Sequence, residues 1–403
     1  MRFLRLPNRF TIDSIWYTIL HNLPLSRPDT SDVERRYLND VLDSDRLAMG
    51  PWLEVFEERM AQCGGARHAV AVSSGTAALH LIVLGLGLGE ADEVITTPYS
   101  FVASSNVLLY AGAHPVFVDI APETYNLDPG QVEGALTPAT RALLAVDIFG
   151  LPAQWPALTQ IARSRNLLLI DDACHALGAD IDGRAIGSWG DAAAFGFYPN
   201  KQITTAEGGC ITTDSDTLAA ACRSLRNQGR ADDTRMEHIR LGYNYRMNEL
   251  SAALGCAQLT RLPTLLKRRA EVAAWYNEAL EPLGQDVVRP FDWNEATRSW
   301  FVYVIRLANH YAPEARDVLM HRLQERGIGC APYFPSIHLQ PYYRRRFGFK
   351  AGDFPVCEAI SARTLALPFY TTLSQDEVAY VANTVQEILP TLPCLTQSIS
   401  LNL

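Results

Sequence analysis

Short apolar runs alternate with helix-like stretches between about residue 65 and residue 213. The runs cover residues 69–73, 93–96, 116–119, 143–148, 167–170, 192–197 and 210–213, and each has the length of a buried strand. The intervening stretches at 76–84, 101–110 and 155–164 have the apolar spacing of helices. Strands separated by helical crossovers indicate an α/β fold with a mostly parallel central sheet that is covered on both faces.

After residue 249 the pattern becomes mainly helical. Residues 249–259 and 265–280 predict two long helices that lead away from the sheet. Residues 300–307, a helix at 314–326, and helices around Glu358 and Glu377 form a smaller α+β unit, with a boundary near 282–289. We therefore predict a large domain at residues 25–281, a small C-terminal domain at 282–403 and an N-terminal arm at 1–24.

The first 24 residues do not fit the alternation. Arg2, Arg5 and Arg9 precede residues 12–20, where Asp13 and other polar residues interrupt the apolar run. A signal peptide or membrane anchor needs a longer uninterrupted run, so we interpret the segment as a short extra arm or an over-long start. No other segment is apolar enough to span a bilayer, and we expect no membrane association.

Composition narrows the possible functions. Hydrophobic residues make up 48% of the chain and charged residues 20%, which is typical of a soluble globular enzyme. The net charge of −9 argues against nucleic acid or an anionic membrane as the main partner. The eight cysteines show neither a Cys-x-x-Cys pair nor the spacing of metal ligands, which predicts reduced thiols, a cytoplasmic location and no metal site.

One lysine follows a strand within a segment of small and hydroxyl-bearing residues. Lys201 lies in the sequence FYPNKQITTAEGG at 197–209, between two apolar runs. Earlier in the chain, the strand at 167–170 is followed by Asp171, Asp172, Ala173, Cys174 and His175. Because ligands of parallel sheets bind at the carboxyl ends of the strands, Lys201 and Asp172 are expected to meet in one cleft.

A lysine and an aspartate at neighbouring strand ends suit pyridoxal phosphate (PLP). The amine forms a Schiff base with the aldehyde, and the carboxylate keeps the pyridine nitrogen protonated so that the ring acts as an electron sink. Taken singly, a loop lysine is usually a solvated charge, and an aspartate pair after a strand usually caps a helix or turn. Their occurrence together, with a phosphate site, favours the functional interpretation.

That phosphate site is predicted at residues 72–79, where VSSGTAAL reads as a strand, a small-residue turn and a helix start. Amides at a helix N-terminus can cradle a phosphate, although an ordinary capped helix has the same pattern. Residues 97–101 place aromatic rings where one could stack on a bound ring or join the core. Residues 342–346 (YYRRR) suit a nucleotide, a diphosphate or a solvated loop.

Together these motifs resemble the DegT/DnrJ/EryC1/StrS family of PLP-dependent aminotransferases, which act on nucleotide-linked keto-sugars. The resemblance runs from about residue 25 to residue 389. It is carried by PLSRP at 24–28, SGTAAL at 74–79, DACHA at 172–176, residues 197–209, LGYNYRM at 241–247, HLQPY at 338–342 and LP at 367–368. It implies the fold type I aminotransferase architecture and a homodimer with active sites between the subunits.

The resemblance also implies roles for individual residues. Lys201 would be the Schiff-base lysine, Asp172 the partner of the ring nitrogen, and His175 a neighbour of the ring oxygen. The remaining assignments are backbone donors to the phosphate (Gly75, Thr76), a ring that stacks on the cofactor (Phe101), a contact to the partner subunit's cofactor phosphate (Asn244), and candidate substrate contacts (Arg246, His338).

In one respect the chain departs from that family. Many relatives carry a phosphate-binding serine five residues before the lysine, where this chain has Gly196. Losing one hydroxyl donor should weaken phosphate binding by roughly 0.5–1.5 kcal/mol.

The expected reaction is transfer of an amino group from L-glutamate to a nucleotide-linked keto-sugar, in polysaccharide or antibiotic sugar synthesis. The TTAEGG sequence at 204–209 favours C4 of a 4-keto-6-deoxyhexose over C3. Another cyclic ketone such as an inosose is an alternative acceptor. A non-catalytic, PLP-binding regulatory protein is a further alternative. A dehydratase branch of the family has histidine in place of the lysine, so Lys201 counts against that reaction.

Overall fold

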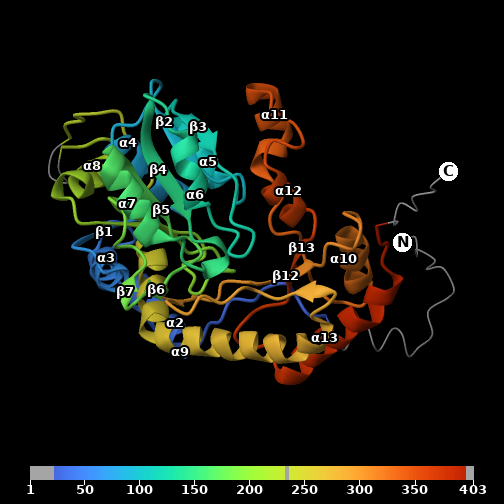
Figure 1. Ribbon diagram of the computed structural model, residues 1–403. Coiled ribbons are helices and arrows are strands. Elements are labelled where there is room, and N and C mark those ends of the chain that lie inside the picture. Colours follow the sequence, from blue (N-terminus) through green and yellow to red (C-terminus); the bar gives the residue numbers. More distant parts are fainter. Residues whose placement is uncertain (1–21, 232–235, 396–403) are drawn as a thin grey trace, which may run out of the picture.

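A seven-stranded sheet forms the centre of the computed structural model, which describes residues 22–231 and 236–395 (Figure 1). The strand order is β1-β9-β8-β5-β4-β2-β3, and β9 alone runs antiparallel to its neighbours. The strands are β1 (His68–Val72), β2 (Glu93–Thr96), β3 (His114–Phe117), β4 (Thr140–Val146), β5 (Leu168–Asp172), β8 (Ala192–Gly196) and β9 (Gly209–Thr213). The predicted mostly parallel sheet is therefore confirmed, with strand ends displaced by a few residues.

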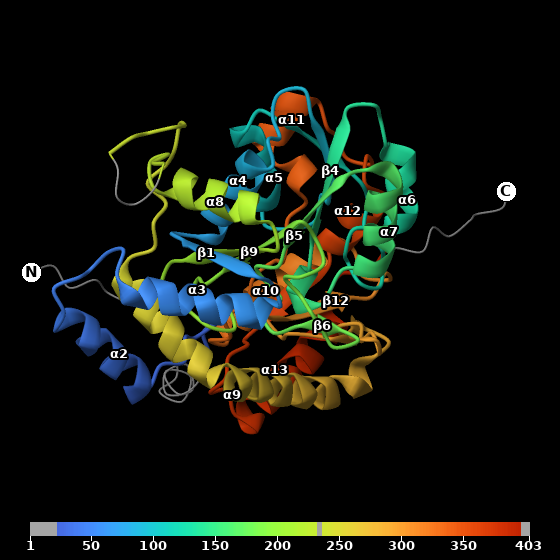
Figure 2. The ribbon, with the colours of Figure 1, turned by 90° about the vertical axis from the view of Figure 1, so that its left-hand side faces the viewer.

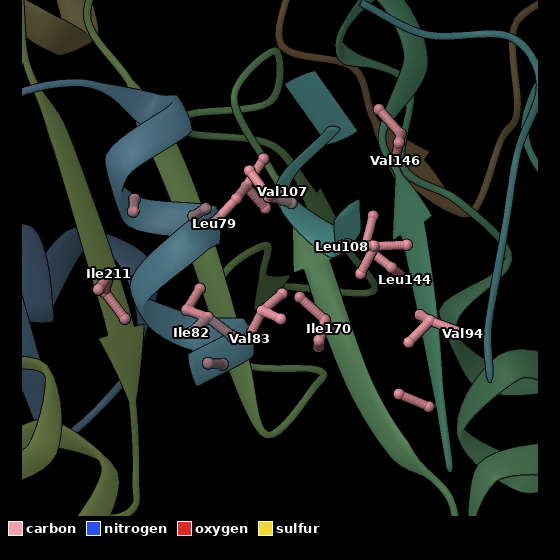
Figure 3. Packing of buried hydrophobic residues seen from close by; sticks show 14 of the residues in the cluster. Leu79, Ile82, Val83, Val94, Val107, Leu108, Leu144, Val146, Ile170 and Ile211 are labelled. Carbon is pink, nitrogen blue, oxygen red and sulfur yellow. The ribbon is translucent and has the colours of Figure 1, made fainter. Parts of the chain in front are cut away.

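Helices cover both faces of this sheet, because its strands are apolar on both sides. Leu144 and Val146 of β4 pack into one core, whereas Leu143 and Ala145 pack into the other. The first core lies under α4 (Gly75–Gly85), α5 (Ala103–Tyr110) and α8 (Asp216–Arg226), and the second under α3 (Pro51–Gly64) and α7 (Trp155–Arg165). Figure 3 shows side chains of α4 packed over β5 and β9 in the first core.

A single long helix, α9 (Glu249–Ala279), replaces the two helices predicted at 249–259 and 265–280. That prediction was wrong because Pro263 lies inside the helix instead of between two helices. An interior proline costs about 3 kcal/mol, but Leu262 and Leu265 on either side of it are buried. Their burial and the packing of α9 on α2 (Asp32–Leu42), α3 and α13 (Gln375–Ile388) offset that cost. In Figures 1 and 2, α9 runs along the base of the molecule.

The C-terminal part contains a second, antiparallel sheet of β10 (Val287–Val288), β12 (Tyr303–Leu307) and β13 (Thr364–Leu367). It shares a third core with α10 (Ala315–Glu325), α13 and the second half of α9. Leu23 joins this core and forms a bridge with Ile328. Apart from residues 22–24, the predicted N-terminal arm lies outside the described residues, and the domain boundaries stay a prediction.

The remaining α-helices and β-strands are short. They are α6 (Pro129–Val132), β6 (Asp180–Ile181), β7 (Arg184–Ala185), β11 (Ala296–Thr297), α11 (Pro341–Phe347) and α12 (Pro355–Ser361). Across the described ranges, no helix is both long and apolar enough to cross a membrane.

Candidate active site

A cavity of about 580 Å³ opens where β5 and β8 end and α4 begins. It is within the size range of small-ligand sites. Both Asp172 and Lys201 line it, as the sequence predicted, and so do Gly75, Thr76 and His175. Phe101 also lines it, with 59% of its surface exposed. The C-terminal part of the chain contributes Phe301, Tyr333, Phe334 and Pro335.

Lys201 is held in an apolar part of the cavity. Its Nζ lies 4.0 Å from the centroid of the Phe301 ring. Burial lowers the pKa of Lys201 to about 8, although the neighbouring Cys174 and Asp172 act in the opposite direction. The backbone is fixed as well, because Nη2 of Arg269 donates to the Lys201 carbonyl at 2.8 Å. The site therefore presents a positioned amine that loses its proton more readily than an ordinary lysine.

Asp172 is the last residue of β5 and is almost fully buried. Its Oδ2 accepts a hydrogen bond from Oγ of Ser104 at 2.6 Å, and its Oδ1 accepts one from the Cys174 amide at 3.3 Å. These donors fix the orientation of the carboxylate at the cavity wall. A buried carboxylate held in this way can stabilise a positive charge on a bound ring.

His175 follows in the turn after β5 and lies flat against aromatic rings. Its ring stacks on Phe301 at 4.4 Å between centroids and on Phe334 at 5.8 Å. Burial, and then the charge of Lys201, lower the pKa of His175 well below the usual value, so the imidazole is neutral. Its buried Nδ1 has no hydrogen-bond partner among the described residues and is free to bond to a ligand.

The start of α4 forms a narrow cradle of backbone groups. The Ser74 side chain caps the helix by accepting a hydrogen bond from the Ala77 amide at 3.0 Å, whereas no described residue accepts from the amides of Gly75 and Thr76. A Cβ atom on Gly75 would come within 2.9 Å of Cys174 Sγ and 3.2 Å of Gly196 Cα. The close approach requires glycine at 75, and the free amides suit an anion.

Three of the sequence-predicted residues lie away from the cavity lining. Asn244 is exposed and forms an isolated bridge with Asn227, whose side chain accepts from Arg246 at 2.9 Å. His338 is fully buried, with its Nε2 2.9 Å from the Glu358 carboxylate. The structure therefore does not support a contact between His338 and a bound substrate, because the ring is fully buried and its Nε2 is paired with Glu358.

Sequence reasoning missed several residues of the site. Ser104 lies in α5, Arg269 in α9 and Phe301 just before β12, and none belongs to a recognisable local motif. Ser104 lies 68 positions from Asp172, and Arg269 lies 68 positions from Lys201. Only the folded chain brings these pairs together.

The cavity fits PLP in each part that the cofactor needs. A buried amine, a fixed carboxylate, an unpartnered imidazole nitrogen and free helix amides correspond to its aldehyde, ring nitrogen, ring oxygen and phosphate. Within the described residues, no group of three or more His, Cys, Asp or Glu side chains is placed to hold a metal ion. Fold and site together define a fold type I, PLP-dependent aminotransferase.

The chain belongs to the DegT/DnrJ/EryC1/StrS aminotransferase family, which matches residues 28–386. It is 38% identical over 380 residues to the spore coat polysaccharide biosynthesis protein SpsC of Bacillus subtilis, covering 92% of this chain and 97% of SpsC. It is 36% identical over 371 residues to GDP-perosamine synthase of Caulobacter vibrioides, covering 92% and 99% of the two chains. These matches make the protein a sugar aminotransferase.

The fold agrees with a solved structure of the same kind. Spr1654 of Streptococcus pneumoniae, in its PLP form, superposes with a TM-score of 0.87 at 27% identity. The match covers 92% of this chain and 99% of Spr1654. The fold type I architecture and the cofactor expected from the sequence are thereby confirmed.

Proposed function

We propose that this enzyme transfers the amino group of L-glutamate to C4 of a nucleotide-linked 4-keto-6-deoxyhexose, in polysaccharide or antibiotic sugar synthesis. The main support is the likeness along almost the whole chain to GDP-perosamine synthase, whose name specifies a nucleotide-linked sugar. The likeness to SpsC supports a polysaccharide pathway. All eight cysteines are free thiols, which favours the cytoplasm as the place of this reaction.

A second cavity of about 710 Å³ supports the substrate class. It adjoins the first and shares Ser100, Phe101, Phe334 and Pro335 with it. Tyr342 and Arg345, from the YYRRR sequence, line its far side. An arginine and an aromatic ring suit a diphosphate and a nucleobase. The keto-sugar would then reach towards Lys201 while its nucleotide occupies the second cavity.

The residues of the first cavity would share the work as follows. When bound, PLP supplies an electron sink that stabilises negative charge on the carbon next to the reacting amine. Nζ of Lys201 takes a proton from one carbon and returns it to another, which a neutral, positioned amine can do. Asp172 holds positive charge at the ring nitrogen, and the Gly75 and Thr76 amides bind the phosphate. His175 and Phe101 would orient the ring.

The lowered pKa of Lys201 gives an expected pH dependence. Only the neutral amine can attack an aldehyde, and below about pH 8 its fraction falls about tenfold per pH unit. The rate at which cofactor-free enzyme captures added PLP should therefore rise with pH up to about 8 and then level off. Stopped-flow absorbance can follow this capture. A rate that continues to rise to about pH 10 would show that the amine titrates as an ordinary lysine.

Gly196, which stands where many relatives have a phosphate-binding serine, gives a second testable expectation for PLP binding. Gly196→Ser should tighten PLP binding by about 2- to 10-fold, because the hydroxyl adds one donor to the phosphate. A Cβ at 196 would lie 3.3 Å from Cys174 Sγ, so the gain should be larger when Cys174→Ala makes room. Fluorescence titration of the cofactor-free variants measures the dissociation constants. Equal affinity with and without the hydroxyl, in both backgrounds, would place the phosphate elsewhere.

The charge of the cavity supports a homodimer with shared sites. Lys201 is the only Lys or Arg among the described residues that line it, whereas Asp172 and Glu207 are both acidic. A cofactor phosphate, a donor carboxylate and a sugar diphosphate need more positive charge and more donors than this lining provides. Asn244 and Arg246 lie on a separate segment, near the strongly exposed Leu241 (84%). We propose that this segment completes the site of a second copy.

Asn244→Ala tests this arrangement. Losing one amide donor to the partner's cofactor phosphate should weaken PLP retention by about 2- to 10-fold without disturbing the monomer's core. Dialysis followed by absorbance at equilibrium measures the retained cofactor, and sedimentation measures the dimer. Asn309→Ala, in the turn after β12, is a matched control. A fully active monomer would contradict the shared site.

The proposed substrates are tested by product analysis. Purified enzyme with PLP and ¹⁵N-labelled L-glutamate would be offered a nucleotide-linked 4-keto-6-deoxyhexose, a 3-keto isomer and an inosose. We expect ¹⁵N at C4 of the first compound, detected by mass spectrometry and NMR. If only the inosose or only the 3-keto sugar were labelled, that compound would be the acceptor and the proposed C4 reaction would be wrong. No labelling with any acceptor, despite bound PLP, would favour a regulatory protein.

A further inference from the structure

Two buried carboxyl groups lie directly behind the cofactor site. Asp147 follows the end of β4, and Asp171 precedes Asp172 on β5. The register pairs Ala145 with Asp171 and Val146 with Asp172, so the three acids lie at the carboxyl ends of two neighbouring parallel strands. Asp147 and Asp171 have no exposed surface. Because alternate residues of a strand point to opposite faces, Asp171 points away from the cavity that Asp172 lines.

The hydrogen bonds of these groups are incomplete if both are ionised. Oδ1 of Asp147 accepts from the Ala153 amide at 2.7 Å and from the Trp155 indole at 2.8 Å. Oδ2 of Asp147 and both oxygens of Asp171 accept no hydrogen bond of good geometry from the described residues, although the Gly187 amide faces Asp171. The two side chains are within hydrogen-bonding contact of each other. Since a carboxylate only accepts, that contact requires a proton on one of them.

No nearby positive charge compensates for a second negative one. In the described part of the chain, neither Asp147 nor Asp171 forms an ion pair with Lys, Arg or His. The groups that face the pair are the Asp172 carboxylate on β5, the Cys174 thiol in the turn after it, the Trp155 indole at the start of α7, and the amides of Ala153 and Gly187. Burial raises the pKa of both acids, and the negative charge of Asp172 raises them further.

We propose that Asp147 and Asp171 share one proton at neutral pH, and that they act as a positioning pair that keeps a single negative charge behind Asp172. Two carboxylates in contact in a dry interior do not both ionise, and they titrate as a unit. The backbone also links this region to the site, since the Asp147 amide donates to the Asp172 carbonyl at 3.3 Å. The shared proton follows from the burial of the two carboxyl groups, their missing donors and their mutual contact. The benefit to Asp172 rests on its proposed role towards the cofactor.

Infrared spectroscopy detects the shared proton without cofactor or turnover. A protonated carboxyl has a C=O stretch that is separate from the carboxylate bands and shifts in D₂O. Subtracting the spectrum of Asp171→Asn from that of the wild type at about pH 7 should leave one such band, because the introduced amide donates to Asp147 in place of the proton. Asp40→Asn, at an exposed carboxyl of α2, should leave none. Absence of the band from the wild type at this pH would overturn the proposal.

A second variant covers the case in which Asp171→Asn does not fold. Asp147→Asn breaks the same hydrogen bond from the other side and should remove or shift the band, and an unchanged band would also overturn the proposal. The effect on the cofactor has its own readout, the pH midpoint of the visible absorption of bound PLP. Asp171→Asn keeps the pair's charge and should leave the midpoint unchanged, whereas the double asparagine variant should lower it. Equal midpoints for these two variants would refute the positioning role while leaving the function of Lys201 untouched.

Discussion

Replacing Lys201 by alanine is expected to abolish amino-group transfer while leaving the fold intact. The variant loses both the amine proposed to react with the cofactor's aldehyde and the base proposed to move the proton between carbons. Acid–base catalysis alone contributes about 10²–10⁴-fold, so a loss of at least that size is expected. The side chain packs on Phe301, and its Nζ donates to none of the described residues, so its removal should disturb the core little. Retained turnover would refute the assignment.

The scarcity of lysine allows an unusually direct control. The chain has three lysines, and both Lys267 and Lys350 are exposed. Borohydride reduction of the PLP-loaded protein should label the peptide that contains Lys201 and neither of the other two. Lys267→Ala, the matched surface variant, should keep both the label and the activity. A label on Lys267 or Lys350 in the wild type would move the reactive amine out of the cavity.

Replacing Asp172 by asparagine is expected to slow the half-reaction with L-glutamate by about 10²–10³-fold. Asparagine preserves the size of the side chain and can still accept from Ser104, so the change removes charge with little change in shape. Without that charge the ring nitrogen is no longer held positive, and the negative charge that builds up during proton removal loses its main stabilisation. Single-turnover absorbance after mixing with L-glutamate measures the rate directly.

Ser104→Ala is the matched control for Asp172. It removes the 2.6 Å hydrogen bond to the carboxylate but leaves the charge in place. A loss of about 3- to 15-fold is expected, in proportion to one hydrogen bond. If Ser104→Ala and Asp172→Asn were equally damaging, orientation would matter more than charge. If neither mattered, the carboxylate would not face the ring nitrogen.

Much of the fold could be predicted from the sequence because the sheet is buried on both faces. Strands such as β4 and β8 are short runs of almost continuous apolar residues, a pattern that few other structures produce. The chemistry of Asp172 and Lys201 was equally visible, because each lies at or just beyond the end of such a strand, where ligands of parallel sheets bind. The local sequence pattern is therefore enough to predict the sheet and the two main residues of the site, Asp172 and Lys201.

The features that the sequence does not predict depend on contacts between residues that are far apart in the chain. Ser104, Arg269 and Phe301 carry no local signal, since their positions next to the site arise only from packing between distant elements. The continuity of α9 through Pro263 was missed for the same reason, because tertiary burial offsets a local penalty. The sequence motif suggests His338 as a substrate contact, but its ring is fully buried and its Nε2 is paired with Glu358, 20 positions away.

The central claim is tested most directly by the visible absorption spectrum of the purified, PLP-loaded protein before and after an excess of L-glutamate. We predict a yellow band that bleaches as the cofactor takes up the amino group and is restored when a keto-sugar acceptor is added. A band that L-glutamate leaves unchanged would contradict the proposed donor. If added PLP produced no band at all, the interpretation of Lys201 and Asp172 as a cofactor site would be wrong.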